Sequence, residues 1–167
     1  ERFFSAQQWA TFFDVPSTSY VFNSTVLQRS CIEKLQEAKE RLHYLELFTN
    51  VLGSLQEDIE RAEQFSQNQS YEQCLIKASE AKAHANAILS TTGIDQSELP
   101  QIVDVKLAAL GKHIARTVEK RAFPLLGYSY YEYARSLRDY DMVSALLYSE
   151  YGLELSNLDI YFEKEKV

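Results

Sequence analysis

A Glu-x-x-His pair is the first arrangement in this chain whose residue types and spacing suit chemistry. Glu40 and His43 stand at the spacing of the metal ligands in di-iron carboxylate bundles. Such a site needs a second Glu-x-x-His, and neither His84 nor His113 has an acidic residue three positions before it. Glu40 and His43 also lie off the apolar side of their predicted helix. We therefore expect an exposed polar pair, and a carboxylate–histidine metal enzyme is the least favoured function.

The remaining reactive residue types form no recognisable constellation. Cys31 and Cys74 belong to no metal-spaced cluster, and they can be bridged only if their two helices pack side by side. We expect two buried free thiols. The chain has no Gly-x-Ser-x-Gly sequence and no glycine-rich phosphate loop, so no catalytic residue and no cofactor are predicted.

Two Asn-x-Ser/Thr sequences are acceptors for N-linked glycans in a domain that lies outside the cytoplasm. They are Asn23-Ser24-Thr25 and Asn68-Gln69-Ser70. Both fall at predicted helix starts, where a glycan fits without disturbing the packing. Such triplets also occur by chance, so alone they are weak evidence for a compartment.

Helices are the elements that must position these residues. The chain of 167 residues has only five glycines and three prolines, which implies short loops and favours helices over a many-turned β fold. Apolar residues recur at alternating steps of four and three from Cys31 to Leu52, the heptad spacing of a helix seam. Short loops favour packing of this seam inside an antiparallel bundle over a dimeric coiled coil. The predicted helices cover residues 24–52, 55–67, 71–89, 100–123, 124–138 and 142–162.

The predicted fold class is all-α, an antiparallel bundle of six or seven helices. Residues 23–162 form a single helical domain, residues 163–167 a charged tail, and residues 1–22 an aromatic segment expected to pack as a lid on the bundle. The formal charge of −7 disfavours nucleic acid as a partner, because phosphate binding requires clustered cations. No apolar run reaches the ~20 residues that cross a bilayer, so we expect no direct membrane insertion by this segment.

A weak internal repeat offers tetratricopeptide-like helical hairpins as a variant of this fold. The sequence Cys74-Leu75-x-x-Ala78-x-x-Ala81 matches Ala145-Leu146-x-x-Ser149-x-x-Gly152. The offset between them is about twice the 34-residue period of tetratricopeptide repeats. Small residues at this spacing are also what any tight helix pair requires, so a plain bundle remains the first expectation.

Tyrosines are concentrated in the hairpin from Phe123 to Phe162. Its first helix is expected to bury Leu126, Tyr130, Tyr133, Ala134 and Leu137. That orientation leaves Tyr128, Tyr131 and Arg135 outward as a candidate patch for contact with a partner, because Tyr and Arg dominate the energetics of interfaces.

The same hairpin carries a family resemblance. The relevant stretches are Leu126-Gly127-Tyr128-Ser129-Tyr130-Tyr131-Glu132-Tyr133-Ala134, Ser144-Ala145-Leu146-Leu147-Tyr148 and Leu155-Ser156-Asn157-Leu158-Asp159-Ile160-Tyr161-Phe162. They resemble the helical region that follows the proteolytic domain of archaeal, membrane-associated Lon-like serine proteases, and Tyr71 to Ala78 is similar in the same way. The resemblance implies a Ser-Lys dyad in an upstream domain and a transmembrane helix after the helical part. No catalytic residue is carried over to this chain.

These observations lead to one expected function and one main alternative. The first is a non-catalytic interaction or spacer domain of a larger, membrane-tethered archaeal Lon-like protease. Its partner would be a protein or peptide, its own catalytic domain or a second copy. The alternative is a free-standing tetratricopeptide-like scaffold that binds a peptide. We expect a membrane-anchored protein with this domain on the extracytoplasmic side; a cytoplasmic domain is the alternative.

Overall fold

The computed structural model describes residues 23–50, 52–120, 123–156 and 158 of the chain. Over these ranges the fold is entirely helical and contains no strand, which confirms the predicted all-α bundle. The expected lid at residues 1–22 and the tail at residues 163–167 lie outside the described residues. The elements are α2 (Ser24–Glu46), α3 (Gly53–Gln67), α4 (Tyr71–Thr91), the short 3-10 helix η2 (Gln96–Glu98), α5 (Leu99–Glu119), α6 (Leu125–Leu137) and α7 (Met142–Leu155).

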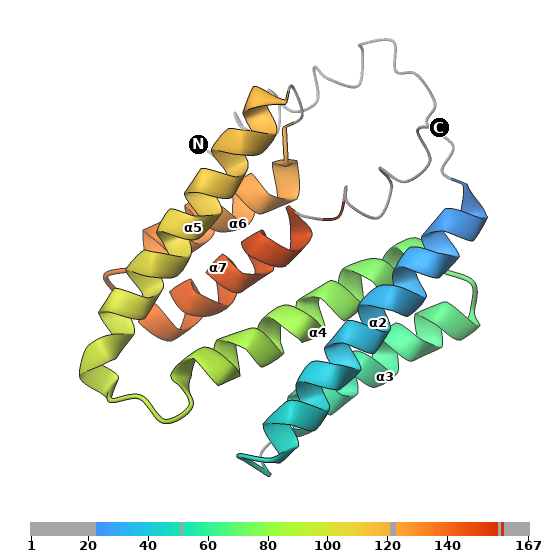
Figure 1. The fold of residues 1–167 in the computed structure, drawn as a ribbon, viewed down its shortest axis with the longest axis horizontal. Coiled ribbons are helices and arrows are strands. Elements are labelled where there is room, and N and C mark those ends of the chain that lie inside the picture. Colours follow the sequence, from blue (N-terminus) through green and yellow to red (C-terminus); the bar gives the residue numbers. More distant parts are fainter. Residues whose placement is uncertain (1–22, 51, 121–122, 157, 159–167) are drawn as a thin grey trace, which may run out of the picture.

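The helices form two units of three that follow each other along the chain (Figure 1). In the first unit α4 packs against α2 and α3, and in the second unit α7 packs against α5 and α6. The two units meet where α4 packs against α7. Equivalent helices begin at residues 24 and 99, 53 and 125, and 71 and 142. Each unit therefore contains three helices at similar spacing along the chain, and the tetratricopeptide-like variant of the fold stays a prediction.

The core of the first unit follows the predicted seam. Leu35, Ala38, Leu42 and Leu45 are buried along α2, as expected from the heptad spacing. The helix ends at Glu46, however, and not at Leu52. The next helix, α3, begins at Gly53. The seam is completed by apolar residues of the other two helices: Leu55, Ile59, Ala62, Ala78, Ala81 and Ala85.

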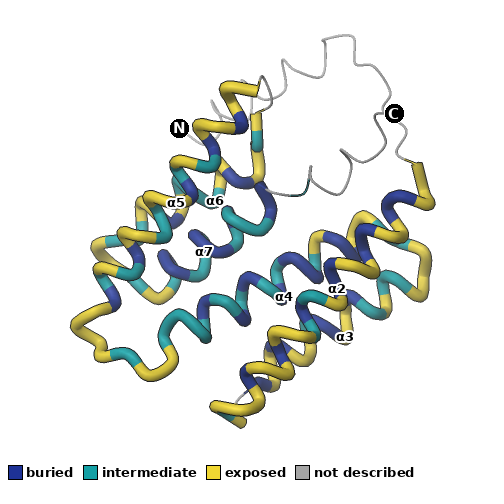
Figure 2. Tube along the Cα trace, in the orientation of Figure 1, coloured by how far each residue is buried: buried dark blue, intermediate teal, exposed yellow. Residues whose placement is uncertain are grey.

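Small residues allow the central helices to approach closely. In α4, five alanines are buried and the helix is covered along most of its length (Figure 2). In α7, Ala145, Ser149 and Gly152 are buried. A Cβ built on Gly152 would lie 2.4 Å from a methyl carbon of Leu110, so a larger residue here would force the Leu110 side chain to move. The packing of α7 against α5 therefore depends on side-chain size as well as on hydrophobicity.

A network of charged side chains crosses the bundle beside this apolar core. Lys34 of α2 lies 2.6 Å from Glu154 of α7, and Lys82 of α4 lies 3.2 Å from the same carboxylate. Glu37 contacts both lysines, at 3.3 and 2.8 Å. The Asn86 amide also donates to Glu154. Because the Lys34 side chain is only 3% exposed, its charge requires these partners.

The two cysteines form a disulfide bond, so the expectation of free thiols was wrong. Cys31 of α2 and Cys74 of α4 are both buried, with a distance of 5.6 Å between their Cα atoms. The bridge is possible because α2 and α4 pack side by side, a tertiary arrangement that neither helix pattern reveals. It links two helices of the first unit covalently.

No described helix combines the length and the hydropathy that crossing a bilayer requires.

Candidate functional site

The inner face of α6 determines which side chains point to solvent. Gly127 and Ala134, one heptad apart, are its buried residues. A Cβ built on Gly127 would lie 2.4 Å from the Cβ of Ser156, at the end of α7. Helix α6 therefore rests directly on α7 through its smallest residues, and its larger side chains lie to the sides and outside.

The outer face of α6 is apolar and rich in tyrosine. Leu125, Tyr128 and Tyr133 are 48%, 40% and 62% exposed. Phe123, just before the helix, is 58% exposed, and its ring centroid lies 5.3 Å from that of Tyr128. Positions three, four, seven, eight and eleven residues apart share one helix face. The outer face is lined by Leu125, Tyr128, Ser129, Glu132, Tyr133 and Ser136, which with Phe123 border an open groove of about 780 Å³.

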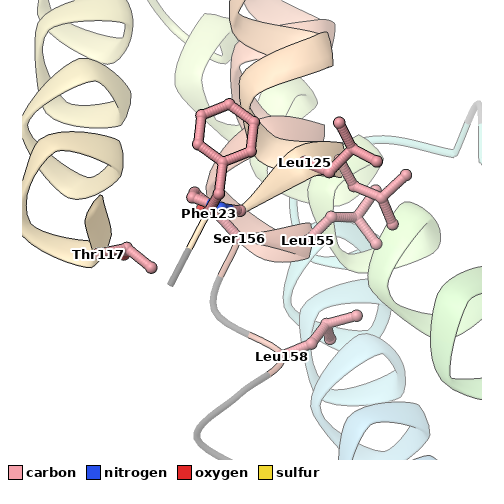
Figure 3. Close-up of a pocket in the computed structure, with 8 residues that line it drawn as sticks. Thr117, Phe123, Leu125, Leu155, Ser156 and Leu158 are labelled. Atoms are coloured by element: carbon pink, nitrogen blue, oxygen red, sulfur yellow. The ribbon is translucent and has the colours of Figure 1, made fainter. Parts of the chain in front are cut away.

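A second, smaller groove adjoins the start of α6. It has a volume of about 310 Å³ and lies where the end of α5, the beginning of α6 and the end of α7 converge. Figure 3 shows Leu125 and Leu155 on one side of it and Thr117 at the end of α5. Phe123 and Leu125 line both grooves. The apolar surface is therefore continuous from the end of α7 onto the outer face of α6.

A tyrosine cluster supports the outer face from behind. The Tyr133 ring lies 5.8 Å from that of Tyr148 of α7, which also stacks on Tyr130 at 5.8 Å. Tyr151 contacts both Tyr130 and Tyr148 edge to face, at 5.5 and 6.0 Å. Edge-to-face and offset contacts of this kind stabilise ring orientations. Tyr133 is thus held by the cluster at one edge while most of its surface remains exposed.

Three tyrosines of this region have phenols with a raised pKa. Burial raises the pKa of Tyr151 to about 12, and the carboxylates of Glu80 and Asp58 contribute to the rise. Burial and Glu80 also raise the pKa of Tyr130. On the outer face, the hydrogen bond from Tyr128 to the Glu132 carboxylate raises the pKa of the Tyr128 phenol. Because an ordinary tyrosine is already protonated at neutral pH, these three shifts matter only in the alkaline range.

The three residues of the predicted patch, Tyr128, Tyr131 and Arg135, do not all lie on the same side of α6. Tyr128 is 40% exposed, and the Arg135 side chain is 65% exposed and 3.7 Å from Glu132. Tyr131 is half-buried on the other side of the helix, where its ring would lie 3.5 Å from a Cβ placed on Gly111 of α5. The expectation that all three face outward was therefore wrong for Tyr131. Whether Tyr128 and Arg135 contact a partner stays a prediction.

The orientation of α6 also explains two other differences between the sequence prediction and the structure. Tyr133 and Leu126, both expected in the core, are 62% and 46% exposed. The prediction placed the largest apolar residues inward, whereas α7 approaches too closely for any but the smallest. The spacing of Gly127 and Ala134 was the sequence signal that could have located the inner face.

The other sequence candidates lie apart from this surface. Glu40 and His43 are exposed on α2, in the orientation that was predicted for them. Within the part of the chain that the structure describes, no three His, Cys, Asp or Glu side chains are grouped so as to hold a metal ion. Glu150 of α7 is 2% exposed and its carboxylate lies 2.5 Å from the Lys106 ammonium, although Oε1 is not in hydrogen-bond geometry.

No protein-family model, curated protein or solved structure matches this chain. The resemblance to Lon-like proteases thus stays a prediction that rests on the quoted stretches.

Proposed function

We propose that this chain is a helical interaction domain that binds a protein partner through the outer face of α6. In the form we favour, it is the non-catalytic part of a larger, membrane-tethered Lon-like protease, and the partner surface belongs to that protease's own catalytic domain. The observation that carries the proposal is the continuous exposed surface of Phe123, Leu125, Tyr128 and Tyr133.

The chemistry of this surface suits a protein partner. Tyrosine side chains bury a large area at low conformational cost, and their hydroxyls find hydrogen-bond partners at the edge of an interface. Interface hot spots are enriched in Tyr for this reason. The Tyr133 ring is already oriented by Tyr148, so binding would sacrifice little side-chain entropy.

The shape of the surface favours a macromolecule over a small ligand. The groove is open and follows one helix face from Leu125 to Ser136. At about 1.5 Å per residue this is roughly 16 Å of helix, the length that three turns of a partner helix or a short extended segment would cover. Small-molecule sites, in contrast, usually enclose most of their ligand.

The disulfide bond supports a location on the extracytoplasmic side of a membrane. Disulfides form and persist in oxidising compartments and are rare in the cytosol of mesophiles. The Cys31–Cys74 bridge is buried at 0% exposure of both residues, as expected of a structural link and not of a redox-active pair.

A free-standing scaffold that binds a peptide is the second candidate. It is favoured by the repetition of the three-helix unit, since repeat proteins commonly offer binding surfaces along stacked helices. The two candidates use the same outer face of α6. They differ in whether the occupant belongs to the same assembly or is a separate peptide.

A site-specific photo-crosslinker distinguishes these candidates. Benzoylphenylalanine replaces Tyr133 in the full gene product within its own cells, and Glu60, an exposed residue of α3, is the matched control position. After irradiation, crosslinked peptides are identified by mass spectrometry. We expect Tyr133 to yield a crosslink to a defined peptide of a protease domain in the same assembly, and Glu60 to yield none.

Other outcomes of this experiment are equally decisive. A crosslink from Tyr133 to one separate protein would favour the scaffold. Equal crosslinking from both positions, or none from Tyr133, would show that the outer face of α6 is not a specific interaction surface.

A further inference from the structure

Both glycan-acceptor sequences lie on the surface in defined local structures. Asn23 is the N-cap of α2, where its side-chain oxygen accepts a hydrogen bond of 2.9 Å from the backbone N–H of Thr25. This Asx-type turn uses Oδ1 and not Nδ2, the atom to which an N-linked glycan is attached. Asn68 is exposed at the C-cap of α3, in the turn that leads to α4.

The fold brings these two asparagines to the same end of the first unit. Helix α2 runs toward α3, α3 returns, and α4 begins where α3 ends (Figure 1). Asn23 precedes α2 and Asn68 follows α3, so both lie opposite the α2–α3 turn. They belong to a different three-helix unit from the outer face of α6.

The disulfide provides evidence on compartment that is independent of the acceptor sequences. Cys31 and Cys74 follow the two asparagines early in α2 and α4, so the bridge closes the end of the bundle where both asparagines lie. A chain that acquires a disulfide has passed through an oxidising compartment. Transfer of N-linked glycans takes place on that same side of the membrane.

We infer that Asn23 and Asn68 are N-glycosylated, which gives this domain one glycan-bearing end and leaves the outer face of α6 uncovered. The inference rests on the extracytoplasmic location proposed above, but not on the identity of the partner.

The modification requires a sugar donor bound to a lipid phosphate or pyrophosphate. The asparagine Nδ2 attacks the anomeric carbon C1 of the first sugar, and the Nδ2–C1 bond forms. The bond from C1 to the phosphate oxygen breaks, and the lipid phosphate leaves with its electron pair. A base of the transferase takes the proton from Nδ2, and nothing is oxidised or reduced.

Peptide mass spectrometry of the protein from its own cells is the direct test. We expect the peptides with Asn23 and Asn68 to carry sugar mass increments in most copies. The peptide with Asn50, which is exposed but followed at the second position by Leu52, should be unmodified. The same digest, prepared without reductant, reports whether Cys31 and Cys74 are joined.

Matched variants separate glycan transfer from a structural effect. Thr25→Val removes the hydroxyl that the transferase requires but keeps the Asn23 cap, whereas Thr25→Ser keeps both. Secreted behind a leader from a glycosylating host, T25V should lose the mass of one glycan and T25S should not. Ser70→Ala and Ser70→Thr form the same pair for Asn68.

The outcomes also distinguish this inference from the proposed function. Unmodified Asn23 or Asn68 in a protein whose cysteines are joined would overturn the assignment for that residue and leave the proposed location intact. Free cysteines together with unmodified asparagines would overturn both the glycosylation and the extracytoplasmic location.

Discussion

The Cys31–Cys74 bridge is the residue-scale feature with the largest expected effect on stability. It closes a loop with a sequence separation of 43 residues. In the chain-entropy model such a loop stabilises the fold by about 4 kcal/mol relative to the reduced chain. We predict that the double variant Cys31→Ala/Cys74→Ala loses roughly this free energy of unfolding in urea titrations.

Thiol titration provides the control for this prediction. Unfolded protein without reductant should react with no thiol reagent, and reduced protein should offer two thiols per chain. Two reactive thiols in the untreated protein would contradict the bridge.

Tyr151 makes stability depend on pH in the alkaline range. Its pKa is raised by burial to about 12 in the folded chain, against 10.0 for an ordinary tyrosine. Between these values the unfolded chain has lost the proton and the folded chain has kept it, so the free energy of unfolding falls as pH rises. Below pH 10 this contribution is fully present.

Urea titrations at a series of pH values check this prediction. The decline between pH 10 and 12 should be shallower in Tyr151→Phe, which cannot ionise. Tyr140→Phe, at an 89% exposed position, should leave the decline unchanged. Identical slopes for Tyr151→Phe and the parent chain would contradict the assigned environment of Tyr151.

Lys34 of α2 belongs to a network of charged side chains that also includes Lys82 of α4 and Glu154 of α7. Its nearest anion is Glu154, at 2.6 Å. Removing one partner of a buried pair leaves an uncompensated charge, at a cost of about 3 kcal/mol here, since Lys82 still contacts Glu154. We predict this loss for Lys34→Met in denaturant unfolding.

The matched control is Lys39→Met, which breaks an ion pair with Glu63 whose two side chains are each 36% exposed. Exposed pairs contribute under about 1 kcal/mol. The double variant Lys34→Met/Glu154→Leu should regain most of the loss, because it buries no lone charge. Equal effects of Lys34→Met and Lys39→Met would refute the buried network.

At the scale of elements, the contact between α6 and α7 depends on Gly127. A Cβ at this position would lie 2.4 Å from the Cβ of Ser156, too close for a change of rotamer to relieve. Overpacking of this kind costs about 1–3 kcal/mol, so Gly127→Ala should lower the melting temperature. At Gly53 a Cβ meets nothing within 4 Å, and Gly53→Ala should be neutral or slightly stabilising. A neutral Gly127→Ala would show that the helices lie farther apart.

The existence of the elements and the buried face of α2 were predicted from sequence, whereas the rotation of α6 was not. The heptad seam located α2, since local periodicity determines such a pattern. The rotation of α6 was missed because it depends on how closely α7 approaches Gly127. The seam also concealed Lys34, a charged residue among core positions whose partners come from distant helices.

At the scale of the whole molecule, the class of fold followed from composition and the arrangement did not. The small number of glycines and prolines predicted a helical bundle. The sequence match between the stretches that begin at Cys74 and at Ala145 indicated a repeat. The packing of α4 against α2 and α3, and of α7 against α5 and α6, shows two units of three helices. The disulfide was missed because it joins Cys31 and Cys74, which lie on two helices that become neighbours only in the folded chain.

Hydroxyl-radical footprinting tests most directly whether the outer face of α6 binds a partner. The isolated chain is compared with the full assembly purified from its own cells, and the oxidation of each tyrosine is measured by mass spectrometry. We predict that Tyr128 and Tyr133 are protected several-fold in the assembly, while Tyr140, 89% exposed in the α6–α7 turn, is labelled equally in both samples. Equal labelling of Tyr128 and Tyr133 in the two samples would contradict the proposed interaction surface.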